Sequence, residues 1–267
     1  MRLLLLILTI CLCACTTRRV QTNRTPLTLK ILSYNIHHAN PPSRPNHIDV
    51  NAIAKVISDQ RPDLVALQEV DVYTMRSGSG LNEASEIAKL AGMPYFFFAK
   101  AINHDGGEYG VAILSRYPLS KMKSRSLPDS IGSKAEKRTL GSALVALPGG
   151  RKILFASTHL DAGRGDARRV MQMQAVSDML AQEKIPVIIA GDLNAQDNSE
   201  VIKILDRNFT RTCISNCGFT IPEIKPNKTI DYIAFRPAAQ FSVLKHEVIN
   251  ESYASDHLPV FAEVQLK

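Results

Sequence analysis

Short apolar runs alternate with amphipathic segments along the chain, and this pattern predicts a mixture of strands and helices. Apolar residues recur at helical spacing over residues 50–59, 82–91 and 166–182, so we predict helices there. The Met residues of the third segment are expected to fill the core. Apolar runs of strand length occupy residues 27–34, 64–67, 95–99, 111–114, 142–147, 153–157, 187–190, 230–235, 241–246 and 259–265.

The order of these elements predicts the fold class. Strands and helices alternate early in the chain, whereas Pro148-Gly149-Gly150 indicates a hairpin and the final segments are mostly strand. A single parallel sheet explains neither the hairpin nor the closing run of strands. We therefore predict an α/β protein with two mixed β-sheets packed face to face and helices outside, as one domain over residues 27–267.

The first residues have the features of an export signal. Arg2 precedes the apolar run Leu3–Ile10, whose eight residues are too few to span a bilayer. Ala14 then precedes Cys15, and this end resembles a bacterial lipoprotein signal. We expect residues 1–14 to be a signal peptide, Cys15 to be lipidated, and residues 15–26 to include a polar tether. Ordinary secretion is the alternative.

The first residues also bear on the location of the protein, and we add an expectation for its oligomeric state. Thr16, rather than an acidic residue, follows Cys15, so inner-membrane retention is not indicated. We expect the protein to be attached to the bacterial cell envelope, at the periplasmic side of the outer membrane, and to be a monomer. A lipid anchor attaches a protein to the membrane without a spanning segment.

Composition and cysteine usage narrow the picture further. With 267 residues, 45% of them hydrophobic, the chain has ordinary globular composition. The net charge of +7 favours anionic partners such as phosphodiesters or lipid headgroups, although a solvated basic surface explains it equally well. Cys213 and Cys217 are four residues apart in a polar loop, where a disulfide is expected in an oxidising compartment. Free thiols and a metal site are the alternatives.

Oxygen-donor side chains at the ends of apolar runs predict a site for a hard cation. Asn35, Glu69 and Asp256 suit Mg²⁺ or Mn²⁺, with waters and a substrate phosphate completing the coordination. Each of the three has an ordinary structural alternative, as a turn cap or a salt-bridge partner.

The cluster Gly191-Asp192-Leu193-Asn194 follows a fully apolar strand and carries the strongest catalytic pattern. Gly191 lets the chain turn, so Asp192 and Asn194 can emerge on the same side. The carboxylate can take a proton from an attacking water, and the amide can hold that water or a phosphoryl oxygen. A turn with hydrogen bonds from Asp and Asn side chains is the structural alternative.

Two histidines complete the candidate catalytic set. His257 follows Asp256 and can polarise a phosphoryl oxygen, with Asp231 as the group that fixes its tautomer. His159 stands at the end of the apolar run 153–157 and can supply a second donor. A histidine at a strand end is also commonly a hydrogen-bonded surface residue.

The ordered motifs resemble the endonuclease/exonuclease/phosphatase (DNase I-like) superfamily, which includes DNase I-like nucleases, neutral sphingomyelinases and inositol-polyphosphate 5-phosphatases. The motifs are Tyr-Asn-Ile-His-His at 34–38, Leu-Gln-Glu-Val-Asp at 67–71, Tyr-Gly-Val-Ala-Ile-Leu-Ser-Arg at 109–116, Ser-Thr-His-Leu-Asp at 157–161, Gly-Asp-Leu-Asn at 191–194, Ile-Asp-Tyr-Ile at 230–233 and Ser-Asp-His-Leu-Pro-Val at 255–260.

This resemblance implies a four-layer α/β sandwich with its site at one edge of the two sheets. It also implies roles at the matching positions. The residues placed around the metal would be Asn35, Glu69 and Asp256. Asp192 and Asn194 would activate and orient water, Asp231 would support His257, and His159 would contact the phosphate.

Departures from the family pattern concern the substrate. His37 stands where DNA-repair members carry Asp, and Val111 stands where several relatives carry Asn. With no Trp and only 6% aromatic residues, the chain lacks the wedges expected of a groove-binding nuclease. His37, Arg164 and Arg168 are candidates for contacting the substrate.

Three functional hypotheses follow from the sequence. The first is a metal-dependent phosphodiesterase or phosphatase acting on a lipid headgroup or small phosphoester. The second is an Mg²⁺-dependent endonuclease or exonuclease, and the third is a non-catalytic, anion-binding envelope lipoprotein. Fold alone does not decide among them.

Overall fold

The computed structural model describes residues 25–129 and 135–267. The predicted signal peptide, the lipidation site Cys15 and most of the tether therefore lie outside the described residues. Within the described part of the chain, no helix is both long and apolar enough to cross a membrane.

Two six-stranded sheets form the centre of the molecule. Sheet A has the strand order β11-β12-β1-β2-β4-β3, and sheet B has the order β5-β6-β7-β8-β10-β9. The strands of sheet A are β1 (Leu27–Asn35), β2 (Leu64–Val72), β3 (Tyr95–His104), β4 (Gly107–Ser115), β11 (Phe241–Val248) and β12 (Val260–Leu266). Those of sheet B are β5 (Leu119–Ser126), β6 (Thr139–Leu147), β7 (Arg151–His159), β8 (Val187–Asp192), β9 (Thr210–Arg211) and β10 (Asp231–Arg236).

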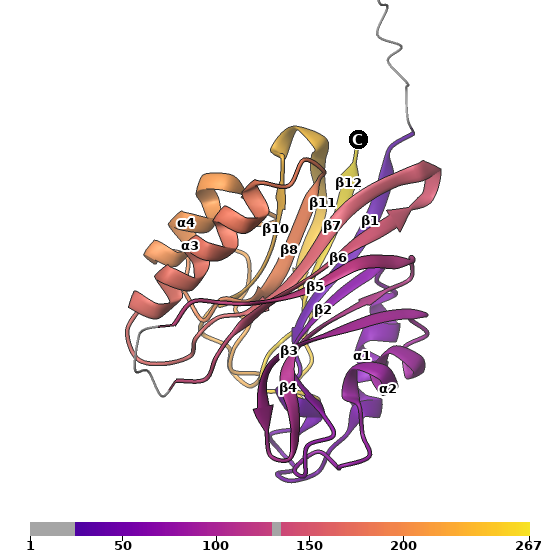
Figure 1. Ribbon diagram of the computed structural model, residues 1–267, viewed down its shortest axis with the longest axis vertical. Coiled ribbons are helices and arrows are strands. Elements are labelled where there is room, and N and C mark those ends of the chain that lie inside the picture. Colours follow the sequence, from indigo (N-terminus) through magenta and orange to yellow (C-terminus); the bar gives the residue numbers. More distant parts are fainter. Residues whose placement is uncertain (1–24, 130–134) are drawn as a thin grey trace, which may run out of the picture.

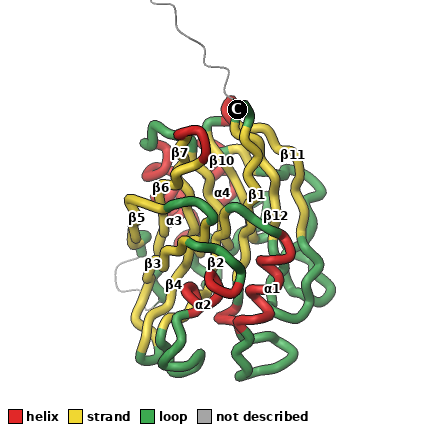
Figure 2. Tube along the Cα trace, turned by 90° about the vertical axis from the view of Figure 1, so that its right-hand side faces the viewer, coloured by secondary structure: helices red, strands yellow, loops and turns green. Residues whose placement is uncertain are grey.

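Four α-helices lie on the outer faces of the sheets (Figures 1 and 2). Helices α1 (Val50–Gln60) and α2 (Glu83–Leu90) cover sheet A, and α3 (Ala167–Ala181) and α4 (Glu200–Asn208) cover part of sheet B. The inner faces of the sheets bury a shared core that includes Ile31, Ile113, Phe155 and Ile188. The structure thus confirms the predicted sandwich of two mixed sheets with helices outside.

Some elements were missed or predicted too short. Strand β5 was missed because it is an exposed edge strand of mostly polar residues, which gives no apolar alternation. Helix α4 was also missed, although it buries Val201, Ile202, Ile204 and Leu205 and is capped by Ser199. Strands β2, β3 and β4 extend several residues past their predicted ends, because pairing between strands continues through polar residues.

The topology brings the carboxyl ends of several strands to one edge of the sandwich. Strands β1 and β2 run parallel with Asn35 beside Gln68, and β7 and β8 run parallel with His159 beside Asp192. Gly191 is needed here, because a Cβ at this position would lie 2.0 Å from the carbonyl oxygen of Thr158. Motifs that are far apart in sequence therefore meet at this edge.

Candidate active site

Asp192 is the centre of a network of polar side chains from both sheets. One of its carboxylate oxygens, Oδ2, accepts a hydrogen bond from Asn35 Nδ2 at 3.1 Å. The same oxygen lies 3.5 Å from His159 Nε2 and 3.8 Å from His257 Nε2. The other oxygen accepts the backbone N–H of Asn194 at 2.8 Å. Asp192 is 1% exposed, so this network is shielded from water.

The electrostatics of Asp192 suit a base near neutral pH. Burial raises the pKa of this carboxyl to about 7, and the charge of Asp231 adds to the increase. The charge of His257 and the hydrogen bonds from Asn194 and Asn35 act in the opposite direction. A carboxylate with such a pKa can exchange a proton with water near physiological pH.

His257 is held by Asp231 in an orientation that points its other nitrogen at Asp192. Its Nδ1 lies 2.9 Å from Asp231 Oδ2, and both side chains are buried. Burial lowers the pKa of His257, but the charge and hydrogen bond of Asp231, with the charge of Asp192, outweigh it and raise the pKa to about 10. His257 is therefore a cation at neutral pH, with Nδ1–H donating to Asp231 and Nε2–H directed at the centre.

His159 has the opposite electrostatic environment. Arg138 Nη1 lies 3.2 Å from its Nδ1, and because a guanidinium only donates, Nδ1 must be the acceptor. Its Nε2 lies 3.5 Å from Asp192 Oδ2 and 3.0 Å from Nδ2 of Asn194. Burial and the charges of Arg138 and His257 hold the pKa of His159 well below its usual value.

Backbone strain places two of the site residues. Glu69 has φ of 57° and lies where the pairing of β2 with β4 shifts register between Leu67 and Val70. This bulge re-aims consecutive side chains, so Gln68 is buried while Glu69 remains half-buried near Asn35, whose Nδ2 donates to Glu69 Oε1 at 3.0 Å. Asn194 has φ of 48°, also in the left-handed region. Strain of this kind is common at functional sites.

Ser255 connects Asp256 to Asn35, because its hydroxyl contacts both residues. Ser255 Oγ donates to the backbone oxygen of Asn35 at 2.7 Å and also lies 3.4 Å from Asp256 Oδ1. Asp256 and Glu69 are both half-buried, in contrast to the fully enclosed Asp192 and Asp231. Two partly open carboxylates beside an amide are a donor set that fits a hard cation retaining several waters.

A second acidic group also has the composition of a metal site. One ligand atom each from Asp192, Asp231 and His257 lie within 4.8 Å of one another. However, all three side chains are buried, and Nδ1 of His257 is already in contact with Asp231 Oδ2 at 2.9 Å. We therefore favour Glu69 and Asp256 as the residues that face a cation.

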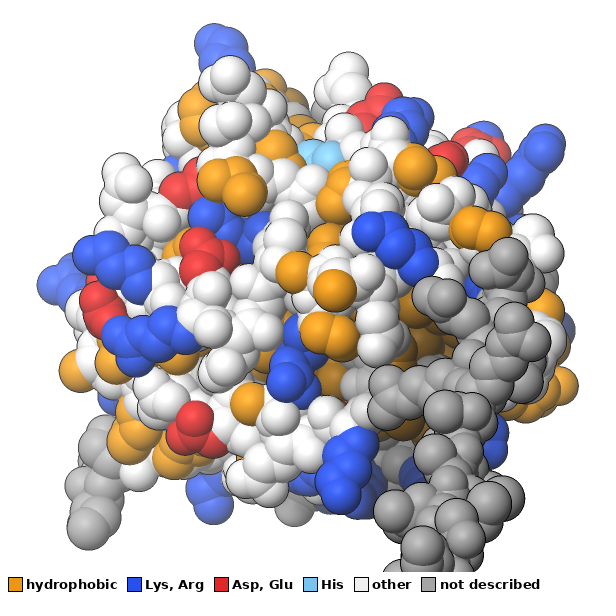
Figure 3. Space-filling view, turned by 90° about the horizontal axis from the view of Figure 1, so that it is seen from above, with side chains coloured by type: hydrophobic (Ala, Val, Ile, Leu, Met, Phe, Trp, Pro, Cys, Tyr) orange, Lys and Arg blue, Asp and Glu red, His pale blue; other side chains and the backbone are white. Residues whose placement is uncertain are grey.

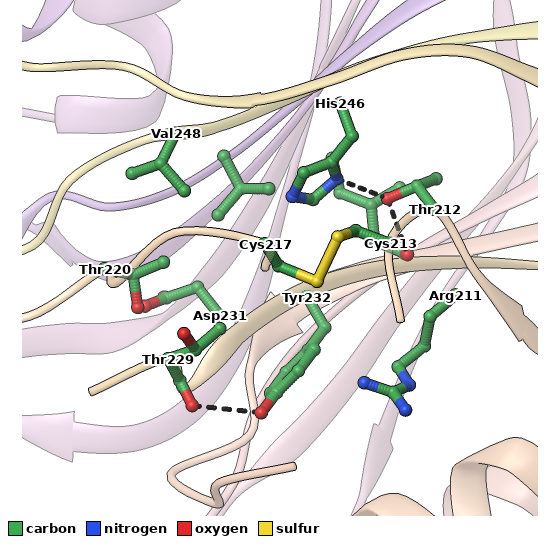
Figure 4. A pocket seen from close by; sticks show the side chains of 12 residues that line it. Arg211, Thr212, Cys213, Cys217, Thr220, Thr229, Asp231, Tyr232, His246 and Val248 are labelled. Atoms are coloured by element: carbon green, nitrogen blue, oxygen red, sulfur yellow. Dashed lines mark hydrogen bonds between the residues drawn. A yellow bond between two sulfur atoms is a disulfide. The ribbon is translucent and has the colours of Figure 1, made fainter. Parts of the chain in front are cut away.

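The disulfide predicted as one alternative is present between Cys213 and Cys217. Figure 4 shows it between His246 and Tyr232, in a small pocket that Asp231 and Thr212 also line. His246 Nδ1 lies 2.9 Å from Thr212 Oγ1, and the Tyr232 hydroxyl donates to the backbone oxygen of Thr229 at 2.9 Å. The disulfide loop thus packs against the strand that presents Asp231.

The three candidates for substrate contact lie in different environments. His37 Nδ1 is 2.8 Å from the backbone oxygen of Asn40, within its own turn, while its backbone N–H donates to Asn35 Oδ1. Arg168 is held by Asp161 at 2.8 Å and Asp129 at 3.2 Å, so its charge is already paired. Arg164 is exposed in the loop before α3. Their role in binding substrate stays a prediction.

Two buried contacts at the site were not anticipated from the sequence. Gln68 Nε2 donates to Ser157 Oγ at 3.3 Å, and Ser157 Oγ donates to the backbone oxygen of Leu67 at 3.2 Å, which joins the two sheets just behind the catalytic edge. Arg138 contacts His159 and forms an ion pair with Glu136 at 2.6 Å, and neither contact was indicated by the sequence. Its position beside His159 depends on the pairing of β6 with β7.

Comparisons with known proteins agree with this geometry. The model of the Endonuclease/Exonuclease/phosphatase family matches residues 32–257. The chain is 26% identical to the uncharacterised protein YbhP of Escherichia coli K12 over 250 residues, covering 89% of this chain and 96% of YbhP.

Solved structures show the same fold. The mannosyl-6-phosphatase of Bacteroides thetaiotaomicron superposes with a TM-score of 0.71 at 19% identity, covering 88% of this chain and 99% of that one. The catalytic domain of human Nocturnin with a bound sulfate gives a TM-score of 0.71 at 21% identity, covering 91% and 98%.

Proposed function

The chain belongs to the endonuclease/exonuclease/phosphatase family, and on this premise we propose that it hydrolyses phosphoesters by attack of water on phosphorus at Asp192. Family members are hydrolases that act on phosphoesters. The observation that supports the proposal most directly is the position of Asp192. Its Oδ2 lies 3.5 and 3.8 Å from two histidines whose pKa values are shifted in opposite directions.

Each residue of the centre has a distinct part in the proposed reaction. Asp192 removes the proton from the attacking water, and the Asn194 amide orients that water. His257, charged through its contact with Asp231, donates to a phosphoryl oxygen as negative charge develops there. Neutral His159, on the other side of Asp192, contacts the phosphate. Donors fixed in a site that excludes water stabilise such charge without reorganisation.

A divalent cation fits beside this centre. Glu69 and Asp256 would hold it from the solvent side, with the nearby Asn35 linking them to Asp192. Bound Mg²⁺ or Mn²⁺ would neutralise charge on the phosphoryl oxygens. Isothermal titration with Mn²⁺ tests this without an activity readout. Glu69→Gln should weaken Mn²⁺ binding at least tenfold, whereas the matched change Glu86→Gln on α2 should leave it unchanged. Equal affinity in both variants would exclude Glu69 as a ligand.

The proposed substrate is a lipid headgroup or a small phosphoester. A mannosyl-6-phosphatase shares the fold, and the sequence lacks Trp for intercalation into a nucleic acid. Hydrolysis should be compared on a sugar phosphate, sphingomyelin, an inositol phosphate and plasmid DNA, with Mg²⁺, Mn²⁺ or EDTA. If plasmid DNA is hydrolysed in preference to the other substrates, and Asp192→Ala abolishes this hydrolysis, the protein is a nuclease instead. Inactivity on all four substrates with every metal would favour a non-catalytic, anion-binding protein.

The expected membrane attachment is a separate part of the proposal. The lipoprotein-like residues 1–15 motivate a monomeric enzyme at the periplasmic side of the outer membrane, held by a lipid on Cys15. Cys15→Ser should release the full chain from the membrane fraction of the expressing bacterium, because it removes the acylated side chain. Unchanged recovery with the membranes would contradict the anchor.

A further inference from the structure

A basic cavity of about 430 Å³ lies on the outer face of sheet B, away from the catalytic edge. It is formed by strands β5, β6 and β7 and by the segment that follows α3. Five cationic residues line it together with one acidic residue, Glu183: Lys121, Lys123, Arg125, Lys152 and Lys184. Its volume is in the range of sites that bind small ligands.

Among the described residues, the cations of the cavity lack ion pairs, in contrast to most arginines near helices α3 and α4. Arg168, Arg169 and Arg211 all form ion pairs with carboxylates at 2.6–3.2 Å. Within residues 25–129 and 135–267, none of the five cavity cations forms an ion pair. Like charges that face one cavity repel each other unless an anion enters.

Two buried polar atoms of the cavity lack partners as well. Ser142 is 1% exposed, yet its Oγ makes no hydrogen bond, and Nη1 of Arg125 is buried without an acceptor. Buried polar groups are normally satisfied, so an unpartnered hydroxyl and guanidinium N–H in one cavity indicate a missing acceptor. Ser142 is paired with Lys123 across β5 and β6, which places both side chains on the same face of the sheet.

We propose that this cavity is a second, non-catalytic site that binds the phosphate groups of a polyanionic ligand. Phosphate oxygens accept hydrogen bonds from Ser142 Oγ and Arg125 Nη1, while the lysines neutralise the remaining charge. Leu144, Leu154 and Ile185 supply an apolar wall for the body of the ligand. Lys152 is seven residues from His159 on β7, about 23 Å along a strand. Ser142 is paired with Ala156, three residues before His159, and side chains an odd number of residues apart point to opposite faces of a sheet, so the cavity and the catalytic centre are separate sites.

The phosphate can come from a soluble molecule or from a lipid headgroup. Arg151, next to Lys152, donates to the backbone oxygen of Thr25, where the described chain enters the domain. Figure 3 looks onto that end of the molecule and shows Lys and Arg side chains spread over it, with fewer Asp and Glu. A phosphorylated headgroup is therefore one source to test and a free polyphosphate is the other.

The first experiment measures binding of pyrophosphate to the full chain carrying Cys15→Ser. Titrations are done in EDTA and in a His159→Ala/His257→Ala background, which weakens phosphate binding at the catalytic centre. Lys123→Gln/Arg125→Gln should weaken the remaining binding at least tenfold. The control Lys55→Gln/Lys89→Gln removes the same charge from α1 and α2 and should change it less than twofold. Absence of binding in the catalytic background, or equal loss in both double variants, would overturn the proposal.

A second experiment identifies the source of the phosphate and uses the same variants. A lipid headgroup would be assigned if the protein cosediments with phosphatidylglycerol vesicles but not with phosphatidylcholine vesicles. Lys123→Gln/Arg125→Gln should then abolish this cosedimentation. Pyrophosphate binding without vesicle binding would assign a soluble ligand. Ser142→Ala should reduce affinity several-fold while leaving the thermal midpoint of the free protein unchanged. Unchanged affinity would exclude Ser142 as a donor to the ligand.

Discussion

Sheet B presents polar side chains at two places, its catalytic edge and its outer face, and the two groups differ in the contacts that they make. At its catalytic edge, the oxygens of Asp192 contact Asn35, Asn194, His159 and His257, so side chains from both sheets surround one carboxylate. On its outer face, Ser142 Oγ and Arg125 Nη1 are buried without partners among unpaired lysines. The first region is preorganised before a substrate arrives, whereas the second needs an anion to complete it.

This difference shows how each region can be recognised. Burial and the like charge of Asp231 raise the pKa of Asp192, whereas burial lowers the pKa of His257 but the nearby carboxylates outweigh it and raise that pKa. Shifts of this kind are typical of groups that transfer or hold protons. Like charges around a cavity instead indicate a ligand whose charge is opposite. The following substitutions test the two regions, from the largest expected effect to the smallest.

Replacing the central carboxylate should separate catalysis from stability. Asp192→Asn keeps the shape of the side chain but removes the base, so turnover should fall by about 10²–10⁴. Since the folded-state pKa of Asp192 is raised, its ionisation destabilises the fold as pH rises toward 7 and above. Urea denaturation at pH 8 should show equal or higher stability for the variant. A marked loss of stability would identify Asp192 as a structural residue.

The contact between Asp231 and His257 should set the alkaline limit of activity. A raised pKa of about 10 keeps His257 protonated, so its donor function is lost only as pH rises through that value. Asp231→Asn removes the charge that raises the pKa, so the alkaline limb of the kcat profile should move down by one or more pH units. NMR titration of His257 in both proteins is the direct check. An unshifted titration would contradict this assignment.

Substitutions in the cavity should change the stability of the protein and leave its turnover of a small substrate nearly unchanged. Lys123→Gln/Arg125→Gln removes facing like charges, so the free energy of unfolding should rise by about 0.5 kcal/mol at low salt and by less at high salt. Turnover of a small soluble phosphoester should stay within twofold of the original. Lys55→Gln/Lys89→Gln should show no such gain, since those lysines are paired with Asp59 and Glu86. Lower stability in the cavity variant would indicate that its charges are already compensated.

Periodicity and motif order predicted most of the fold and the candidate residues at the catalytic edge. Apolar runs such as Val187–Ala190 identify buried strands because both faces of such a strand must be covered. Strand β5 could not be predicted in this way, because it is held by backbone pairing to β6 and its side chains face solvent or the cavity. The cavity residues on β5 were therefore missed with it.

The arrangement inside the site could be predicted only in part. The pairing of Asp231 with His257 was anticipated because a catalytic histidine requires an orienting partner. The contact of Arg138 with His159, the bulge that re-aims Glu69 and the bridge from Gln68 to Ser157 were not. They depend on the register between strands and on the packing of one sheet against the other, which a linear pattern does not specify.

The sequence by itself determined the chemistry that the chain can offer: the alternation that makes two covered sheets, and the types of side chain at the strand ends. Tertiary structure decided which of these groups touch, and therefore which proton each one holds. The reason is physical, because a pKa depends on burial and on charges within a few ångströms. Those distances are fixed by strand register, as with His159 beside Asp192, and not by separation along the chain.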